Sequence, residues 1–410
     1  MRCKFCNTKI ENVTFDLGNT APSNSLIVSE HLFTSEKTYP LVLYTCPSCF
    51  LVQIEEQVGG TDIFNEDYVY FSSASKYWLA HAKNYCIDIT RRLSLDEDSF
   101  VVEIASNDGY LLSNFVDSKI RCLGIEPTRG TANEAMLKGI PTLVEFFNIS
   151  LAEQLASEGE RADLIIANNV LAHVPDINDF VASFAKLLKP EGTITIEFPH
   201  LLELLKCNEF DTIYHEHFFY FSLHTLQIIF DKYDLSIYDV DELETHGGSL
   251  RIYIAHKKST LNKGATKINI EKVLKEEHLY NINTLDCYNC LKNNAFKIKL
   301  QALEYLVKQK SSGKSIAAFG AAAKGNTFLN YIGIKSDIID FIVDETPYKI
   351  GKYAPQSKIP IVSFEKIKSE KPDIIIILPW NHKNEILEKL QFTKEWGADL
   401  VTFIPELEVL

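Results

Sequence analysis

Short hydrophobic runs alternate with stretches of helical spacing along the middle of the chain. Strands that alternate with helices in this way pack into a parallel sheet. A closing hairpin is expected from residues 235–240 and 249–255. The other predicted strands are residues 100–105, 122–126, 141–147, 162–168 and 193–198. The pattern therefore predicts an α/β fold built on a seven-stranded, doubly wound sheet.

A second and smaller α/β pattern follows toward the C-terminus. Residues 262–310 contain lysine-rich helical stretches, with one predicted helix over residues 280–310. Apolar runs of strand length then follow at residues 315–319, 337–343 and 372–378, and they predict a Rossmann-like unit. We expect three parts with limits at residues 1–65, 66–262 and 263–410.

Composition narrows the class of protein. The 410 residues suffice for two to four domains at roughly 100–200 residues each. A net charge of -14 argues against a nucleic-acid partner, because binding phosphates requires a basic face. The chain shows neither a secretory leader nor a membrane-spanning apolar run. Its nine cysteines then indicate reduced thiols in the cytoplasm, and the sequence is compatible with a monomer.

Four cysteines near the start form two CxxC pairs, Cys3 with Cys6 and Cys46 with Cys49. Each pair directs two thiolates at one point, and two pairs complete a tetrahedral zinc site without an open position. The alternatives are four unrelated thiols or a redox pair, and the doubled motif argues against both. A third CxxC, Cys287 and Cys290, lacks a partner pair, so we interpret it as packing.

The loops after the first two predicted strands indicate a nucleoside cofactor. Glu103 lies in the first strand, and Glu126 ends the second, about 20 residues beyond the first loop, which is the spacing of a ribose-binding acid. The loop has Gly109 but no glycine series for a pyrophosphate, which disfavours NAD and favours S-adenosylmethionine. An unrelated α/β fold is the alternative. The candidate cofactor residues are Glu103, Ala105, Ser106, Asn107, Gly109, Glu126, Pro127, Phe147, Asn168 and Tyr70.

A segment rich in aromatic residues and histidine follows the fifth predicted strand. Tyr214, His215, Glu216 and His217 lie within four positions, where ligands bind at the carboxyl ends of strands. The alternative is a buried wall with satisfied histidines, which we favour for either histidine taken alone. A zinc-protease site is excluded, because the HExxH spacing is absent.

The C-terminal unit has its own candidate ligand site. Small residues precede a predicted helix at Lys324, an arrangement that suits anion capture by backbone N–H groups. The alternatives are a domain that only packs against the rest of the chain and binds no ligand, and an independent NAD site. The candidate substrate-binding residues are Asn169, Lys324, Asn326, Asp344 and Asn381.

Taken together, the CxxC pairs and the runs EIASNDG, NVLAHV, YHEHFFYFS, HGGSLR and AAFGAAAKGNTFLNY resemble the sugar C-methyltransferase family over almost the whole chain. The resemblance implies the class I methyltransferase fold, an N-terminal zinc module, and a C-terminal domain that holds a nucleotide-diphosphate sugar. It implies methylation at C3 of a 4-keto-6-deoxyhexose, in antibiotic or surface-polysaccharide pathways.

The chemistry of such a reaction agrees with the residues present. A ketone acidifies the hydrogen on its neighbouring carbon, so one general base produces the enolate that accepts a methyl group. By the resemblance, His217 is the base, Glu216 orients sugar hydroxyls or the imidazole, and Tyr214 stabilises the enolate oxygen or positions the sugar. His173 and Tyr68 are further catalytic candidates. The alternatives are C5 methylation, a non-catalytic nucleotide-binding protein, and an oxidoreductase.

Overall fold

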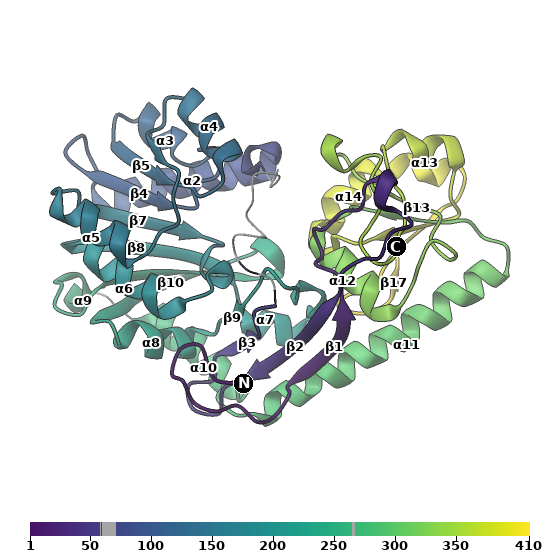
Figure 1. Ribbon diagram of the computed structural model, residues 1–410, viewed down its shortest axis with the longest axis horizontal. Helices are drawn as coiled ribbons and strands as arrows, with labels where there is room; N and C mark the ends of the chain where they lie inside the picture. Colours follow the sequence, from purple (N-terminus) through teal and green to yellow (C-terminus); the bar gives the residue numbers. More distant parts are fainter. Residues whose placement is uncertain (58, 60–70, 265–266) are drawn as a thin grey trace.

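The computed structural model describes residues 1–57, 59, 71–264 and 267–410, and Figure 1 shows its elements. Three sheets organise these residues: one of four strands, one of seven and one of six. The seven-stranded and six-stranded sheets lie in separate lobes, with the small sheet and a long helix beneath them (Figure 1). Of the expected domain limits, residues 65–66 lie outside the described residues and residues 262–263 fall within a short helix.

The small N-terminal sheet is antiparallel, in the order β1-β2-β3-β9. Alternate side chains of β1 and β2 are buried, among them Phe15, Leu41 and Leu43, as expected for strands with one covered face. Its strands are β1 (Phe15–Thr20), β2 (Tyr39–Thr45), β3 (Val52–Ile54) and β9 (Phe219–Tyr220). Because β9 follows the YHEH segment in the chain, the N-terminal sheet is tied directly to that segment.

The large sheet has the strand order β10-β11-β8-β7-β4-β5-β6, and β11 alone among them runs antiparallel to the other strands. This confirms the predicted class I methyltransferase fold. Its strands are β4 (Phe100–Ile104), β5 (Arg121–Ile125), β6 (Thr142–Leu143), β7 (Ala162–Asn168), β8 (Leu188–Pro199), β10 (Leu235–Leu243) and β11 (Ser249–His256). The strand predicted over residues 141–147 is much shorter, because Glu145 and Phe146 turn outward at the sheet edge.

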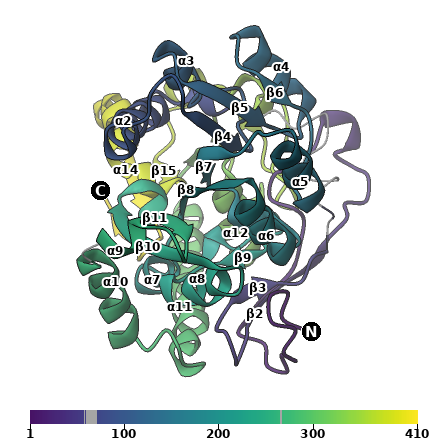
Figure 2. The same cartoon turned by 90° about the vertical axis from the view of Figure 1, so that its left-hand side faces the viewer.

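Helices cover both faces of this sheet (Figure 2). One core packs α2, α3 and α4 against one face, and another packs α5, α6 and α8 against the opposite face. The helices of this lobe are α2 (Lys76–Leu93), α3 (Ser113–Asp117), α4 (Arg129–Leu137), α5 (Ile149–Ser157), α6 (Ile177–Leu187), α7 (Leu201–Lys206), α8 (Leu223–Asp231) and α9 (Leu261–Gly264). In the described part of the chain, none of the helices has the length and apolar character to span a membrane.

The C-terminal sheet has the order β14-β13-β12-β15-β16-β17, and only the last pair is antiparallel. A mostly parallel sheet of this kind is typical of a Rossmann-like unit. Its strands are β12 (Ile316–Phe319), β13 (Phe341–Val343), β14 (Ile361–Val362), β15 (Ile374–Ile377), β16 (Asp399–Thr402) and β17 (Glu408–Val409). Of the later helices, α10 (Ile268–Leu279) packs against β10 and α8 of the large lobe. The others are α11 (Asn289–Ser311), α12 (Ala323–Ile332), α13 (Glu365–Glu370) and α14 (Lys383–Lys389). The helix predicted over residues 280–310 begins only at Asn289, and Cys287 lies in a 3-10 turn before it.

The chain between β1 and β2, residues 21–38, is called the β1–β2 segment below. It crosses from the N-terminal sheet to the C-terminal unit and forms backbone hydrogen bonds with that unit. Ile27 forms an antiparallel bridge with Tyr353, and the backbone N–H of Ala21 donates to the Gln356 side chain. The segment therefore connects two parts of the molecule that are more than 300 positions apart in sequence.

Candidate active site

A cavity of about 1850 Å³ lies between the carboxyl edge of the large sheet and the C-terminal unit. Residues from all three parts of the chain line it, including Asn24 from the β1–β2 segment and Lys324 from α12. Such a position is where doubly wound sheets bind ligands, because the strand ends and their loops leave a crevice.

The predicted ribose-binding acid, Glu126, lines this cavity directly after β5. One carboxylate oxygen accepts the backbone N–H of Asn107 at 3.0 Å, and the other accepts the N–H of Thr128 at 2.8 Å. The side chain of Asn107 in turn accepts the backbone N–H of Ser72 at 2.9 Å. These bonds hold the carboxylate and the loop after β4 in one fixed arrangement.

Three predicted cofactor residues lie behind the cavity wall rather than on it. Glu103 is buried beneath Glu126, and burial first, then the charges of Glu126 and Asp108, raises the pKa of its carboxyl well above the usual range. Gly109 has a φ of +74°, and a side chain there would meet Ile140 at 2.2 Å. The Ser106 hydroxyl packs against Gly124, where a Cβ would lie 2.4 Å away. These residues shape the loop after β4 from below.

The remaining described members of the predicted cofactor set line the cavity: Ala105, Asn107, Pro127, Phe147 and Asn168. Tyr68 and Tyr70 lie outside the described residues. Buried amide atoms of Asn168 and Asn169 have no hydrogen-bond partner among the described residues. Buried polar groups are rarely left unpaired, so these atoms are suited to a polar ligand.

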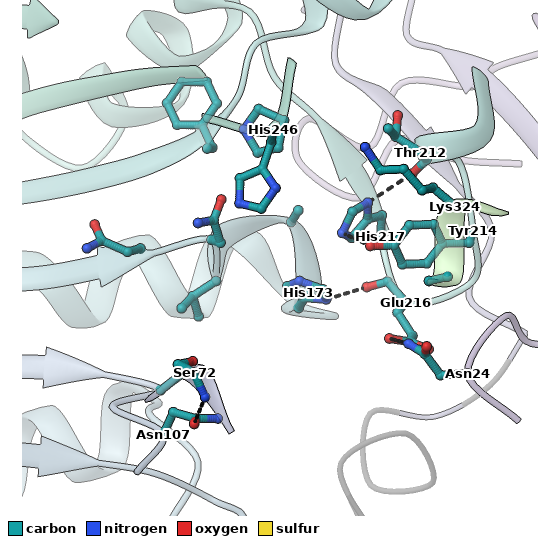
Figure 3. A pocket seen from close by; sticks show the side chains of 18 of the residues that line it. Asn24, Ser72, Asn107, His173, Thr212, Tyr214, Glu216, His217, His246 and Lys324 are labelled. Carbon is teal, nitrogen blue, oxygen red and sulfur yellow. Dashed lines mark hydrogen bonds between the residues drawn. The ribbon is translucent and has the colours of Figure 1, made fainter. Parts of the chain in front are cut away.

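His217 and Tyr214 form a hydrogen-bonded pair on the side of the cavity opposite Glu126 (Figure 3). The His217 Nδ1 atom lies 3.0 Å from the Thr212 carbonyl oxygen, so Nδ1 carries the proton and donates. Burial, followed by the charge of His173, lowers the pKa of His217 well below its ordinary value and keeps the ring neutral. The Tyr214 hydroxyl, 2.7 Å from Nε2, therefore donates to the ring's lone pair.

His173 stands next to this pair, with its ring centroid 4.8 Å from that of His217. Its Nδ1 atom donates to the Glu216 carbonyl oxygen at 2.8 Å. Burial lowers the pKa of His173 to about 4, so this imidazole is also neutral near pH 7. Two neutral imidazoles thus face one cavity, and a neutral imidazole can accept a proton as a general base.

Glu216 turns its carboxylate toward the N-terminal part of the chain. The Asn24 amide nitrogen donates to both carboxylate oxygens at 2.8 Å. Burial raises the pKa of Glu216 to about 7, although the Asn24 bond acts in the opposite direction. The His217 ring is oriented by Thr212 and Tyr214 instead of Glu216. His215 is part of a buried wall, because its ring contacts Tyr39 and its Nε2 atom lies 3.3 Å from the Pro40 carbonyl oxygen.

The C-terminal unit contributes a half-buried lysine. Lys324 lies in the first turn of α12, donates to the Asn381 side chain at 2.9 Å, and covers the Trp380 ring at 4.3 Å. Burial lowers the pKa of Lys324, while the charges of Asp211 and Glu209 raise it. Three of the predicted substrate residues line the cavity: Lys324, Asn381 and Asn169.

Two other predicted substrate residues have structural partners elsewhere. The Asn326 amide donates to the Ser23 carbonyl oxygen at 2.8 Å and is buried. Asp344 accepts backbone N–H groups from Ala321 and Thr346, each at 2.8 Å. Neither belongs to the cavity lining, so the structure does not bring them to the site.

Several lining residues have no sequence signal that would select them. Asn24 is one of three consecutive polar residues in an irregular segment, and Glu209 precedes the YHEH run without any motif. The Glu209 carboxyl is buried, and one of its oxygens has no partner within the described chain. Trp380 donates its ring N–H to Asp211 at 2.8 Å. His246 could be anticipated from the two glycines that follow it, and Trp380 from its place just after the strand predicted over residues 372–378.

The four front cysteines form the expected tetrahedral cluster, away from the cavity. All four Sγ atoms lie within 4.8 Å of one another, with Cys3 to Cys49 at 3.6 Å and Cys6 to Cys46 at 3.5 Å. Four thiolates at Zn–S distances of about 2.3 Å would be separated by about 3.8 Å, which fits a zinc ion. The Gln53 amide also donates to the Cys3 sulfur at 3.3 Å, as outer partners of metal ligands do.

Family models match most of the chain: the C-methyltransferase C-terminal domain over residues 244–405, a methyltransferase domain over 78–240, and a zinc binding domain over 3–64. The C-methyltransferase NovU of Streptomyces niveus is 30% identical over 408 residues, covering 100% of this chain and 96% of that protein. The ubiquinone biosynthesis O-methyltransferase of Bartonella tribocorum is 27% identical over 97 residues, 23% of this chain and 39% of its own. An S-adenosylmethionine-dependent methyltransferase structure from Clostridium acetobutylicum has 10% identity and a TM-score of 0.35, covering 45% of this chain and 93% of its own.

Proposed function

The chain belongs to the C-methyltransferase family and is an S-adenosylmethionine-dependent enzyme, and from this premise we propose that it methylates C3 of a nucleotide-diphosphate-linked 4-keto-6-deoxyhexose. The observation that supports this proposal most directly is the His217–Tyr214 pair in the same cavity as Glu126 and Lys324. A base, a cofactor-binding acid and a cation then border one space, which is what carbon methylation of an anionic nucleotide sugar needs.

The residues present fit S-adenosylmethionine. Glu126 would accept the ribose hydroxyls, and the unpartnered amides of Asn168 and Asn169 offer polar contacts next to it. The loop after β4 has a single glycine, packed against Ile140, so it leaves no cradle for a pyrophosphate. When bound, the cofactor supplies an electrophilic methyl group on a positively charged sulfur.

The chain's own residues would generate the carbon nucleophile. As substrate enters, the Tyr214 hydroxyl would transfer its hydrogen bond from His217 Nε2 to the substrate's keto oxygen. The lone pair of Nε2 is then exposed to the hydrogen on the neighbouring carbon. That C–H bond breaks, its proton moves to Nε2, and its electrons form an enolate whose oxygen Tyr214 stabilises. His173 and Glu216 are next to this pair and are our candidates for holding the sugar hydroxyls.

Charge on the C-terminal side supports a diphosphate-linked substrate. Lys324, Lys349, Lys352 and Lys383 all line the cavity, in a chain whose net charge is -14. Lys349 is paired with Asp344 and Lys383 with Glu408, so Lys324 and Lys352 are the lysines that would meet a diphosphate against the acidic background. The location in the cytoplasm and the monomeric state stay predictions.

The test is to incubate the enzyme with methyl-labelled cofactor and a panel of nucleotide keto-sugars, then to locate the methyl group by NMR. Methylation at C3 is the expected result. Without cofactor, solvent deuterium should exchange into C3, because enolisation precedes methyl transfer. A methyl group at C5 would replace the proposed position, and absence of both transfer and exchange across the panel would overturn the sugar substrate.

Replacing Glu126 by glutamine should raise the Kd for S-adenosylmethionine by roughly 10- to 100-fold. The amide accepts fewer hydrogen bonds, and bonds to a charged group contribute about 1.5–3 kcal/mol each. Isothermal calorimetry measures the change directly. Glu134→Gln, an exposed position on α4, is the matched control. Unchanged affinity in Glu126→Gln would remove Glu126 from the cofactor site.

A further inference from the structure

Asn24 is the one contact by which the β1–β2 segment reaches a proposed catalytic carboxylate within the described chain. Its amide nitrogen lies 2.8 Å from both oxygens of Glu216, and among the residues that the structure describes these are the hydrogen bonds of that carboxylate. The two residues are 192 positions apart in sequence. Figure 3 shows them facing each other at the border of the cavity, below Tyr214.

The residue before Asn24 is anchored to the C-terminal unit. The Ser23 hydroxyl forms a hydrogen bond of 2.8 Å with Thr327, and the Ser23 carbonyl oxygen accepts the Asn326 amide at 2.8 Å. Asn326 and Thr327 are buried on α12, the helix whose first turn contains Lys324. The position of Asn24 is therefore determined by the same helix that places Lys324 at the cavity.

We propose that Asn24 is a positioning residue for Glu216, and that the β1–β2 segment couples the orientation and charge of this carboxylate to α12. The inference rests on the proposed function, because it gives Glu216 a part in binding the sugar. It also assigns the N-terminal part of the chain a task at the reaction site beyond holding zinc.

The physical effect of Asn24 is to keep Glu216 ionised and correctly oriented. A buried carboxylate without donors takes up a proton, and donors to the charged form oppose this. The titratable side chains drawn around it in Figure 3 are His173, Tyr214, His217 and Lys324. Both imidazoles have lowered pKa values and stay neutral near pH 7. Glu216, with its pKa raised to about 7, changes charge there, and so do the buried carboxyls of Glu209 and Asp211 near Lys324, whose pKa values are raised by burial to about 8 and about 6.

Two substitutions separate positioning from simple packing. Asn24→Ala removes the donor and should lower kcat by roughly 10- to 100-fold, the effect of one lost bond to a charged group. Asn24→Asp keeps the shape of the side chain but sets two carboxyls together, which then share a proton. In both variants the acidic limb of the pH–rate profile should move upward, further in Asn24→Asp, while the KM for S-adenosylmethionine stays unchanged. Asn19→Ala, exposed on β1, is the control for the N-terminal sheet.

A second readout is independent of turnover. Carboxyl 13C NMR of glutamate-labelled enzyme, with the Glu216 signal assigned by its loss in Glu216→Gln, reports the titration of this carboxyl. Its midpoint should rise by about one pH unit or more in both Asn24 variants. A wild-type midpoint and an unshifted pH–rate profile would overturn the inference, and Asn24→Asp decides the matter if Asn24→Ala does not fold. If the wild-type enzyme methylates none of the keto-sugars, the proposed function fails, whereas the NMR titration still judges Asn24.

Discussion

His217→Asn should lower kcat for methyl transfer by roughly 10²- to 10⁴-fold, the range that general bases contribute. Asparagine keeps an N–H that can donate to the Thr212 carbonyl oxygen but has no lone-pair nitrogen at the position of Nε2. The Kd for S-adenosylmethionine should change less than about twofold, because Glu126 and its loop lie on the other side of the cavity. Labelled-methyl assays and equilibrium dialysis measure the two quantities.

Deuterium exchange gives the sharper reading of the same variant. His217→Asn should also lose exchange at the substrate carbon, because the step it removes is proton abstraction. His278→Asn, on the exposed face of α10, is the matched control. If His217→Asn kept wild-type exchange while His173→Asn lost it, His173 would be the base instead. Retained turnover in both variants would remove the imidazoles from that role.

Cys46→Ser should release the zinc and unfold the N-terminal sheet. Structural zinc contributes about 10–16 kcal/mol to the folding of small zinc-binding peptides, so loss of a ligand should lower Tm by about 10 °C or more. Methyl transfer should fall with it, because this sheet includes β9 beside the YHEH segment and leads into the β1–β2 segment that holds Asn24. Metal analysis, calorimetry and the methyl assay test the three effects.

Cys287→Ser is the control for the zinc prediction, since this thiol donates to the Thr284 carbonyl oxygen in a way that serine can reproduce. It should leave zinc content and Tm unchanged. A strong chelator on the wild-type enzyme should reproduce the effect of Cys46→Ser. One zinc ion per chain and an unaltered Tm in Cys46→Ser would show that the ligand set is wrong.

Features that depend on local spacing could be predicted from the sequence. Two CxxC pairs indicate a zinc site, because each pair fixes the relative directions of its own thiolates. Continuous apolar runs, such as those of β4 and β7, predict the central strands, because helices cover both faces of the sheet there. Glu126 comes directly after β5, and the carboxyl ends of parallel strands border the cavity, so its position could be predicted from the sheet.

Other features depended on contacts between distant segments. Glu103 and Gly109 lie behind the wall because α4 and β5 pack beside them, and no periodicity reveals which side of a loop faces the ligand. The donor and acceptor roles of His217 follow from Thr212 and Tyr214, whose orientation depends on the folded segment.

The sequence by itself determined the three-part α/β architecture, the zinc ligands and the residue types available for enolate chemistry. The tertiary structure decided which of these residues meet. Asn326, expected at the substrate, holds Ser23 instead, and Asn24, without any motif, holds Glu216. The reason is that strand and helix periodicity specifies which face of an element is buried, whereas a hydrogen bond across 192 or 303 positions exists only after separate units have packed together.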